Sequence, residues 1–238
     1  MSTGISKVVD SLLGRLGART IRGSGNLLTE SRSVKDFDRV NLHGCGQVVI
    51  TQGGDESLVV ETDDNIMPHV RTVVKDRTLD LDFDPKHKNV SPTRLQFTLN
   101  VKDLVGLKIS GSGDMMAASL DTDRLDVRVS GSGNVGIDSL TAKNTRVRIS
   151  GSGNAELAGE VTGQNVGISG SGKYVAQDLH SETVKAKISG SGSATVWVTE
   201  SLNARISGSG VMNYYGKPKV RSKISGSGGI KSQGDHQA

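Results

Sequence analysis

The chain has 238 residues, a formal net charge of +4 and 31 glycines, but only 3% aromatic residues. This composition can fill a long, thin aliphatic core but not a wide aromatic one, so we expect one elongated domain. No apolar run approaches the ~18 residues of a membrane-spanning helix. Because Cys45 is the only cysteine, an intramolecular disulfide framework and a zinc site built on several cysteines are excluded.

Residues 1–21 are predicted to form a short amphipathic helix and a linker. The apolar residues of this helix recur at helical spacing, and they are Ile5, Val8, Val9, Leu12, Leu13 and Leu16. Two roles remain open. The helix can cap one end of a β-stack, because terminal strand edges need covering. Alternatively, it can lie in the headgroup layer of a membrane, since Lys7 and Arg15 accompany its apolar stripe.

Residues 22–104 have an irregular β pattern. Strands are expected near 38–42, 47–51, 57–61, 69–74, 78–83 and 95–101, with turns at 53–54 and 84–85. Within this part, residues 43–46 read His-Gly-Cys-Gly and resemble a degenerate copy of the motif that follows. Cys45 then takes the place of a serine, and we interpret it as a small tolerated residue.

Residues 105–231 repeat the motif Ser-Gly-Ser-Gly, preceded each time by Ile or Val. Its seven copies start at 110, 130, 150, 169, 189, 207 and 225. A unit this short cannot bury its own apolar face, so the units must stack on one another. The repeat therefore predicts a solenoid.

The residues around each motif alternate in character, which is typical of a strand. In the second copy Leu125, Val127 and Val129 share one face, whereas Asp126 and Arg128 share the other. The short interval between successive strands leaves no room for a crossover helix. The predicted fold is therefore an all-β parallel β-helix whose rungs follow the interval of the motif, each with two or three strands. The glycines indicate a corner or a close backbone approach, and residues 232–238 are expected to form a flexible polar tail.

Several segments resemble a known bacterial family. They are Phe37-Asp38-Arg39-Val40-Asn41-Leu42, then residues 44–54, 59–65 and 79–81, and finally the Ser-Gly-Ser-Gly rungs. Together they are similar to the GIN domain, the auto-transporter adhesin head family grouped with the toastrack domains of envelope-stress systems. The resemblance covers roughly residues 22–230. It implies an all-β stack without an assigned enzymatic activity, and it supplies no catalytic or ligand-binding residues.

A basic column is predicted on the outer face. Two residues before each motif, six of the seven rungs carry a cation, and these are Lys108, Arg128, Arg148, Lys187, Arg205 and Lys223. Arg146, Lys185 and Arg221 occupy a neighbouring column, in which Asp126 is the only acid. The charges can simply protect the sheet from lateral aggregation. They can also bind an anionic partner, such as a membrane surface, an acidic polysaccharide or, least favoured because no aromatic is interleaved, nucleic acid.

An enzyme is not predicted. Asp80, Asp82 and Asp84 alternate with apolar residues, as on the outer face of an ordinary strand. No metal-binding or nucleophile motif is complete, so no cofactor or metal is expected. A polysaccharide-active β-helix enzyme remains a minor alternative.

The sequence thus favours a non-enzymatic scaffold or interaction module. We expect a homo-oligomer that associates through an exposed rung end or flat face. Peripheral attachment to the inner face of the cytoplasmic membrane, or a cytoplasmic location, is expected because residues 1–20 lack the pattern of a secretory signal. The alternative is an exported, adhesin-like protein of the cell surface.

Overall fold

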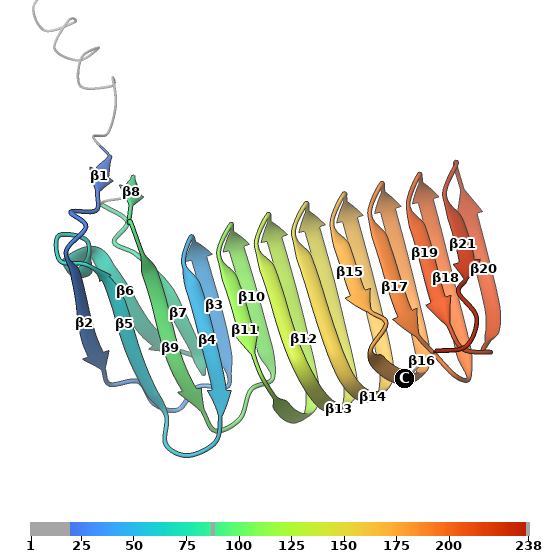
Figure 1. Ribbon diagram of the computed structural model, residues 1–238, viewed down its shortest axis with the longest axis horizontal. Helices are drawn as coiled ribbons and strands as arrows, with labels where there is room; N and C mark the ends of the chain where they lie inside the picture. The colour runs from blue at the N-terminus through green and yellow to red at the C-terminus, as the bar shows by residue number, and fades with distance from the viewer. Residues whose placement is uncertain (1–19, 87–88, 237–238) are drawn as a thin grey trace, which may run out of the picture.

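The computed structural model describes residues 20–86 and 89–236, and this part of the chain is almost entirely β (Figure 1). The predicted stack is present as an elongated parallel β-solenoid that starts at an irregular head. The solenoid strands are β10 (Gly106–Gly111), β11 (Asp114–Ala117), β12 (Leu120–Gly131), β13 (Asn134–Gly151), β14 (Asn154–Gly170), β15 (Lys173–Ala176), β16 (Leu179–Gly190), β17 (Ser193–Trp197), β18 (Ser201–Gly208), β19 (Val211–Tyr215), β20 (Lys219–Ser225) and β21 (Gly229–Ser232).

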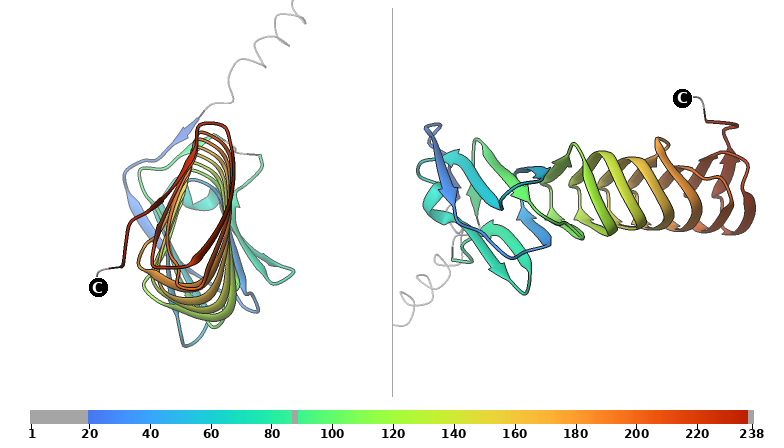
Figure 2. Two further views of the ribbon diagram at one scale, coloured as in Figure 1. Left: turned by 90° about the vertical axis from the view of Figure 1, so that its right-hand side faces the viewer. Right: turned by 90° about the horizontal axis from the view of Figure 1, so that it is seen from below.

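Seen end-on, each rung is a flattened loop, and its two long sides belong to two facing sheets (Figure 2). We call one of them the basic sheet; it contains β10, β12, β16, β18, β20 and the C-terminal parts of β13 and β14. The opposite sheet contains β11, β15, β17, β19, β21 and the N-terminal parts of β13 and β14. The solenoid strands pair in parallel, as the repeat predicts.

The alternation of residues places the aliphatic side chains inside. Leu125, Val127 and Val129 are at most 1% exposed, whereas Arg128 points outward and is exposed. Each inward residue lies opposite its equivalent one rung away; Val127, for example, pairs with Leu107 and with Val147. The core is therefore a continuous aliphatic column, stabilised by burial that no single rung could achieve.

The Ser-Gly-Ser-Gly turns join the two sheets at a sharp edge, and both glycines are needed there. Gly131 has a φ of +119°, which L side chains rarely adopt. At Gly153, a Cβ atom would lie 2.4 Å from the carbonyl oxygen of Gly133 and 2.5 Å from a methyl group of Val129. The predicted close backbone approach is thus present between successive rungs.

Changes in rung length are absorbed on the side away from these turns. Ile137 of β13 pairs with Leu157 of β14, but Leu140 pairs with Gly159, so β14 is one residue shorter between these two points. The register is kept at the motif itself, where Ser150 pairs with Ser169. Close glycine packing leaves no freedom at the sharp edge, whereas the wider corner tolerates a deletion.

The head contains β1 (Ile21–Arg22), β2 (Leu27–Arg32), β3 (Arg39–Gly44), β4 (Gln47–Gln52), β5 (Ser57–Asp63), β6 (Val70–Lys75), β7 (Thr78–Phe83), β8 (Val90–Ser91) and β9 (Leu95–Val101), with a 3-10 turn at Met67–His69. All six strands expected here are present. β1, β2 and β8 were not predicted; Leu27 and Leu28 on β2 are half exposed, so that strand lacks an alternating pattern.

Strand pairing in the head departs from the parallel solenoid. β3 and β4 continue the stack in parallel beside β10 and β11. By contrast, β5 pairs antiparallel with both β2 and β9, and β6 pairs antiparallel with β7. A short turn at Asp76 and Arg77, both with positive φ, allows the β6–β7 hairpin.

Two sequence predictions concern the ends of the chain. The helix with Ile5, Val8, Val9, Leu12, Leu13 and Leu16 lies outside the described residues. Among the residues that are described, no helix has the length and apolar content to cross a membrane. Of the expected tail, residues up to His236 are described, and they turn back from β21 along the side of the stack (Figure 1).

Candidate anion-binding face

The six cations predicted to form a column do lie on adjacent strands of the basic sheet. Lys108 pairs with Arg128, and Arg128 with Arg148. After Gly167 the column continues through Lys187, Arg205 and Lys223. Because parallel strands lie about 4.8 Å apart, neighbouring charges are well within a Debye length of one another.

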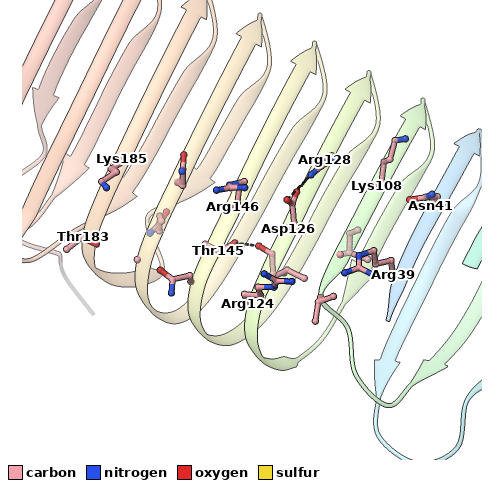
Figure 3. A pocket seen from close by; sticks show the side chains of 18 residues that line it. Arg39, Asn41, Lys108, Arg124, Asp126, Arg128, Thr145, Arg146, Thr183 and Lys185 are labelled. Carbon is pink, nitrogen blue, oxygen red and sulfur yellow. Dashed lines mark hydrogen bonds and ion pairs between the residues drawn. The ribbon is translucent and has the colours of Figure 1, made fainter. Parts of the chain in front are cut away.

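A groove of about 590 Å³ crosses this sheet beside the column (Figure 3). Its charged lining residues are Arg39, Lys108, Arg124, Arg128, Arg146, Lys185 and Asp126. Of the predicted column, only Lys108 and Arg128 reach the groove. The other four cations extend the positive face along the stack.

Two glycines stand at outward positions in the lining of the groove. Gly106 stands between Arg39 and Asp126 in one column, and Gly163 takes the place of a side chain opposite Asn144 and Thr183 in the next. A Cβ atom on Gly163 would lie 2.9 Å from the side-chain oxygen of Asn144. A Cβ atom on Gly106 would likewise lie 3.1 Å from Cγ of Arg39, so neighbouring side chains cover both glycines and line the groove together with the backbone.

Two acids offset these charges, because Asp38 pairs with Arg39 at 2.8 Å and Asp126 is the one acid in the lining itself. Asp126 accepts hydrogen bonds from Arg128 at 2.9 and 3.0 Å, and this bonding raises the pKa of Arg128. Within residues 20–86 and 89–236, no ion pair involves Lys108, Arg146, Arg148 or Lys185. Their positive charge is available to a ligand.

Arg39 and Arg124 were missed by the sequence reasoning. Arg124 has the same outward parity as Arg128 and could have been found from it. Arg39 requires aligning the degenerate motif at residues 43–46 with the regular rungs, since β3 stacks on β10 with Arg39 opposite Gly106. The alignment also places Gly44 opposite Gly111.

The other residues considered from the sequence are held by structural contacts. Asp80 bonds to Asn41, and Asp82 pairs with Arg71. Cys45 is half buried, and burial raises the pKa of its thiol, which disfavours the reactive thiolate. In the described part of the chain, no group of three His, Cys, Asp or Glu side chains could hold a metal ion.

The last rung offers an uncovered end to a second copy of the chain. Every residue of β20 is exposed, including Val220 and Ile224 at 39% and 43%. The strand also carries Lys219, Arg221 and Lys223, and such charges oppose edge-to-edge pairing.

Comparison with known proteins identifies the family. Residues 36–218 match the family model described as "putative auto-transporter adhesin, head GIN domain". The chain belongs to this family. The resemblance found in the sequence is thereby confirmed, and the match covers the head from β3 onward and most of the solenoid.

Solved structures share the same fold. A "putative adhesin" from Bacteroides fragilis is 32% identical, with a TM-score of 0.85 over 89% of this chain and 99% of its own. A "putative lipid binding protein" from Parabacteroides distasonis is 26% identical, with a TM-score of 0.77 over 90% and 99% of the two chains. A "putative adhesin" from Parabacteroides merdae is 25% identical, with a TM-score of 0.72 over 90% and 99%. No curated protein gave a significant match.

Proposed function

We propose that this GIN-domain protein is a non-catalytic, adhesin-like binding module of the cell surface, and that its groove on the basic sheet binds acidic polysaccharide. The observation that carries the proposal is the groove's charge: its lining holds six cations and one acid, and only Arg39 and Arg128 among the cations are paired, with Asp38 and Asp126, in the described part of the chain. Clefts lined by one sign of charge concentrate ligands of the opposite sign. The adhesin description of the family supports the cell-surface alternative over the cytoplasmic location expected from the sequence.

The shape of the face favours a linear polymer. In the column of Asp126, cations at Arg146, Lys185 and Arg221 alternate with Asn165 and Asn203. They recur every second rung, or about 9.6 Å, which suits a chain that carries one acidic group per disaccharide. A flat membrane surface would meet the exposed cations but not the groove floor. The lining includes no aromatic ring on which nucleobases could stack.

Binding of hyaluronate or unsulfated chondroitin, each of which carries one carboxylate per disaccharide, to the purified protein tests the proposal, with neutral dextran as the control polymer. Because the attraction is electrostatic, affinity should fall steeply between about 0.05 and 0.5 M salt. Arg146→Glu combined with Lys185→Glu should weaken binding by about tenfold or more, equivalent to about 1.4 kcal/mol.

A matched variant reverses the same number of charges on the opposite sheet. Lys173→Glu combined with Lys231→Glu affects exposed residues of β15 and β21, so it should change affinity by less than about twofold. Equal losses of affinity in the two variants would show a general charge effect and refute binding in the groove. Binding to phosphatidylglycerol vesicles without binding to either polysaccharide would favour a lipid ligand instead, as the name of the Parabacteroides distasonis relative suggests.

A further inference from the structure

An aromatic cluster lies beyond the N-terminal side of the basic groove, at the start of the strand that carries Thr183 and Lys185. Trp197 at the end of β17 contacts His180 edge-on, with ring centroids 4.7 Å apart. His236 from the C-terminal tail stacks on Trp197, with centroids 4.0 Å apart and planes inclined by 7°. Tyr215 meets the edge of His236 at 5.7 Å. The indole of Trp197 is therefore a flat stacking surface, called the platform below, and the imidazole of His236 already covers it.

The tail reaches this platform by docking along the end of β19. The Gln233 N–H donates to the Tyr214 carbonyl at 2.8 Å, and the Gly216 N–H donates to the Gly234 carbonyl at 2.9 Å. Lys217 pairs with Asp235 at 2.9 Å. These bonds bring the His236 ring over Trp197.

The fit of His236 is incomplete. Its Nε2 atom lies 3.2 Å from Asp178, but its Nδ1 atom is buried without a hydrogen-bond partner. Burying a polar atom unpaired costs about 1–3 kcal/mol. A ligand that stacks on Trp197, donates to Asp178 and leaves no polar atom unpaired would displace the ring at little cost.

A groove of about 320 Å³ adjoins the platform, and His180 belongs to both. Its ionisable lining residues are Asp121, Asp123, Lys143, Glu160, His180 and Glu182, so acids predominate. Such a groove repels the acidic polymers that suit the basic sheet and accepts groups that donate hydrogen bonds.

We propose that Trp197 and the adjoining acidic groove form a second binding site, for the pyranose rings of a neutral or amino-sugar oligosaccharide, and that His236 occupies it in the free protein. The C–H face of a pyranose stacks on an indole as the imidazole does, and its hydroxyl or ammonium groups donate to Asp178. The tail acts as an intramolecular competitor, and the apparent affinity equals the intrinsic affinity multiplied by the fraction of molecules in which the tail is undocked.

Trp197 is the only tryptophan of the chain, so its fluorescence reports on this site alone. We would titrate the full chain with cellopentaose, laminaripentaose, mannopentaose and a chitosan pentamer. At least one of them should shift the emission. His236→Ala should tighten that binding by about tenfold if the tail is docked in about nine molecules of ten. Trp197→Ala should abolish binding, as measured by calorimetry, and Trp197→Phe should retain part of it.

Two controls distinguish this site from the basic groove and from a purely structural tail. Arg146→Glu with Lys185→Glu should leave binding of the neutral pentasaccharides unchanged, so the second site can fail while the basic groove stands. Deletion of residues 233–238 should behave as His236→Ala does. If no pentasaccharide shifts the fluorescence of the full chain or of the deletion variant, the tail is a structural strap only and the proposal is overturned.

Discussion

Asp126 and Arg128 lie two residues apart on β12, where the carboxylate accepts two hydrogen bonds from the guanidinium, at 2.9 and 3.0 Å. Both side chains are partly exposed, and such pairs contribute at most about 1 kcal/mol to stability. The pair matters more for the electrostatics of the groove, because Asp126 is the one acid in its lining.

Asp126→Asn should therefore strengthen polysaccharide binding. Removing one negative charge about 4 Å from an anionic ligand is worth about 1 kcal/mol in water, or about fivefold in affinity. Asp138→Asn is the matched control, since Asp138 is exposed on β13 and lines neither groove. An equal rise in both variants would contradict the expectation.

The second glycine of each motif should be irreplaceable. Gly153→Ala would place a methyl group 2.4 Å from the Gly133 carbonyl oxygen, and overpacking of this kind costs about 3 kcal/mol or more. Gly229→Ala is the control, because a Cβ atom there meets nothing within 4 Å. Urea unfolding gives the free energy of unfolding of both variants. Equal values would contradict the close packing of backbone at Gly153.

A buried polar network stabilises the centre of the solenoid. Tyr174 donates to Gln164 at 2.9 Å, and Gln164 donates to Ser181 at 3.0 Å. Tyr174→Phe leaves the Gln164 carbonyl oxygen without this donor and should cost about 1–3 kcal/mol. Tyr214→Phe, on a partly exposed ring, should cost less. If adding Gln164→Leu to Tyr174→Phe restores no stability, the loss arises from packing instead.

Acid should destabilise the head through Asp63, which is fully buried. Burial alone would raise its pKa, but hydrogen bonds from the Thr93 hydroxyl and from the Gly25 and Thr93 N–H groups outweigh this effect and lower it. The folded-state pKa then lies below the unfolded value of about 3.9. The carboxylate therefore stabilises the fold fully above that value, and this contribution is lost as the pH falls through the folded-state pKa.

Unfolding of the native chain and of Asp63→Asn at about pH 7 and about pH 3.5 measures this effect. The difference in the free energy of unfolding between the native chain and the Asp63→Asn variant should be smaller at about pH 3.5 than at about pH 7. Asp138→Asn, at an exposed position, should show no such trend. A difference that stays constant with pH would exclude Asp63 as the source.

Self-association, which the sequence favours, should occur at the last rung and should depend on salt. Val220 and Ile224 on β20 are uncovered, but Lys219, Arg221 and Lys223 repel their counterparts on a second copy. Screening shortens the Debye length from about 30 Å at 0.01 M salt to about 3 Å at 1 M. Sedimentation velocity should then show more dimer at high salt, and Ile224→Lys should reduce it. A monomer at every salt concentration would contradict this prediction.

Much of the solenoid was predictable because its determinants are local and repeated. The inward residues of one rung pack on the same residue types in the next, as Val127 does on Leu107 and Val147. The basic column follows from the same parity. The antiparallel pairing in the head was not predictable, because β2 has no alternating pattern and pairs with β5, which follows it only after β3 and β4.

By itself, the sequence determined the stack, its inward and outward faces and the column of cations, because a period of two within the longer period of the motif leaves one arrangement that buries the aliphatic residues. Only the tertiary structure decided where a groove and an aromatic platform lie on those faces. The groove brings Arg39 of the head beside Lys108 and Arg124 of the solenoid, and the platform depends on a tail that returns His236 to Trp197 from beyond the last strand. Neither feature repeats from rung to rung, so the period of the sequence could not predict it.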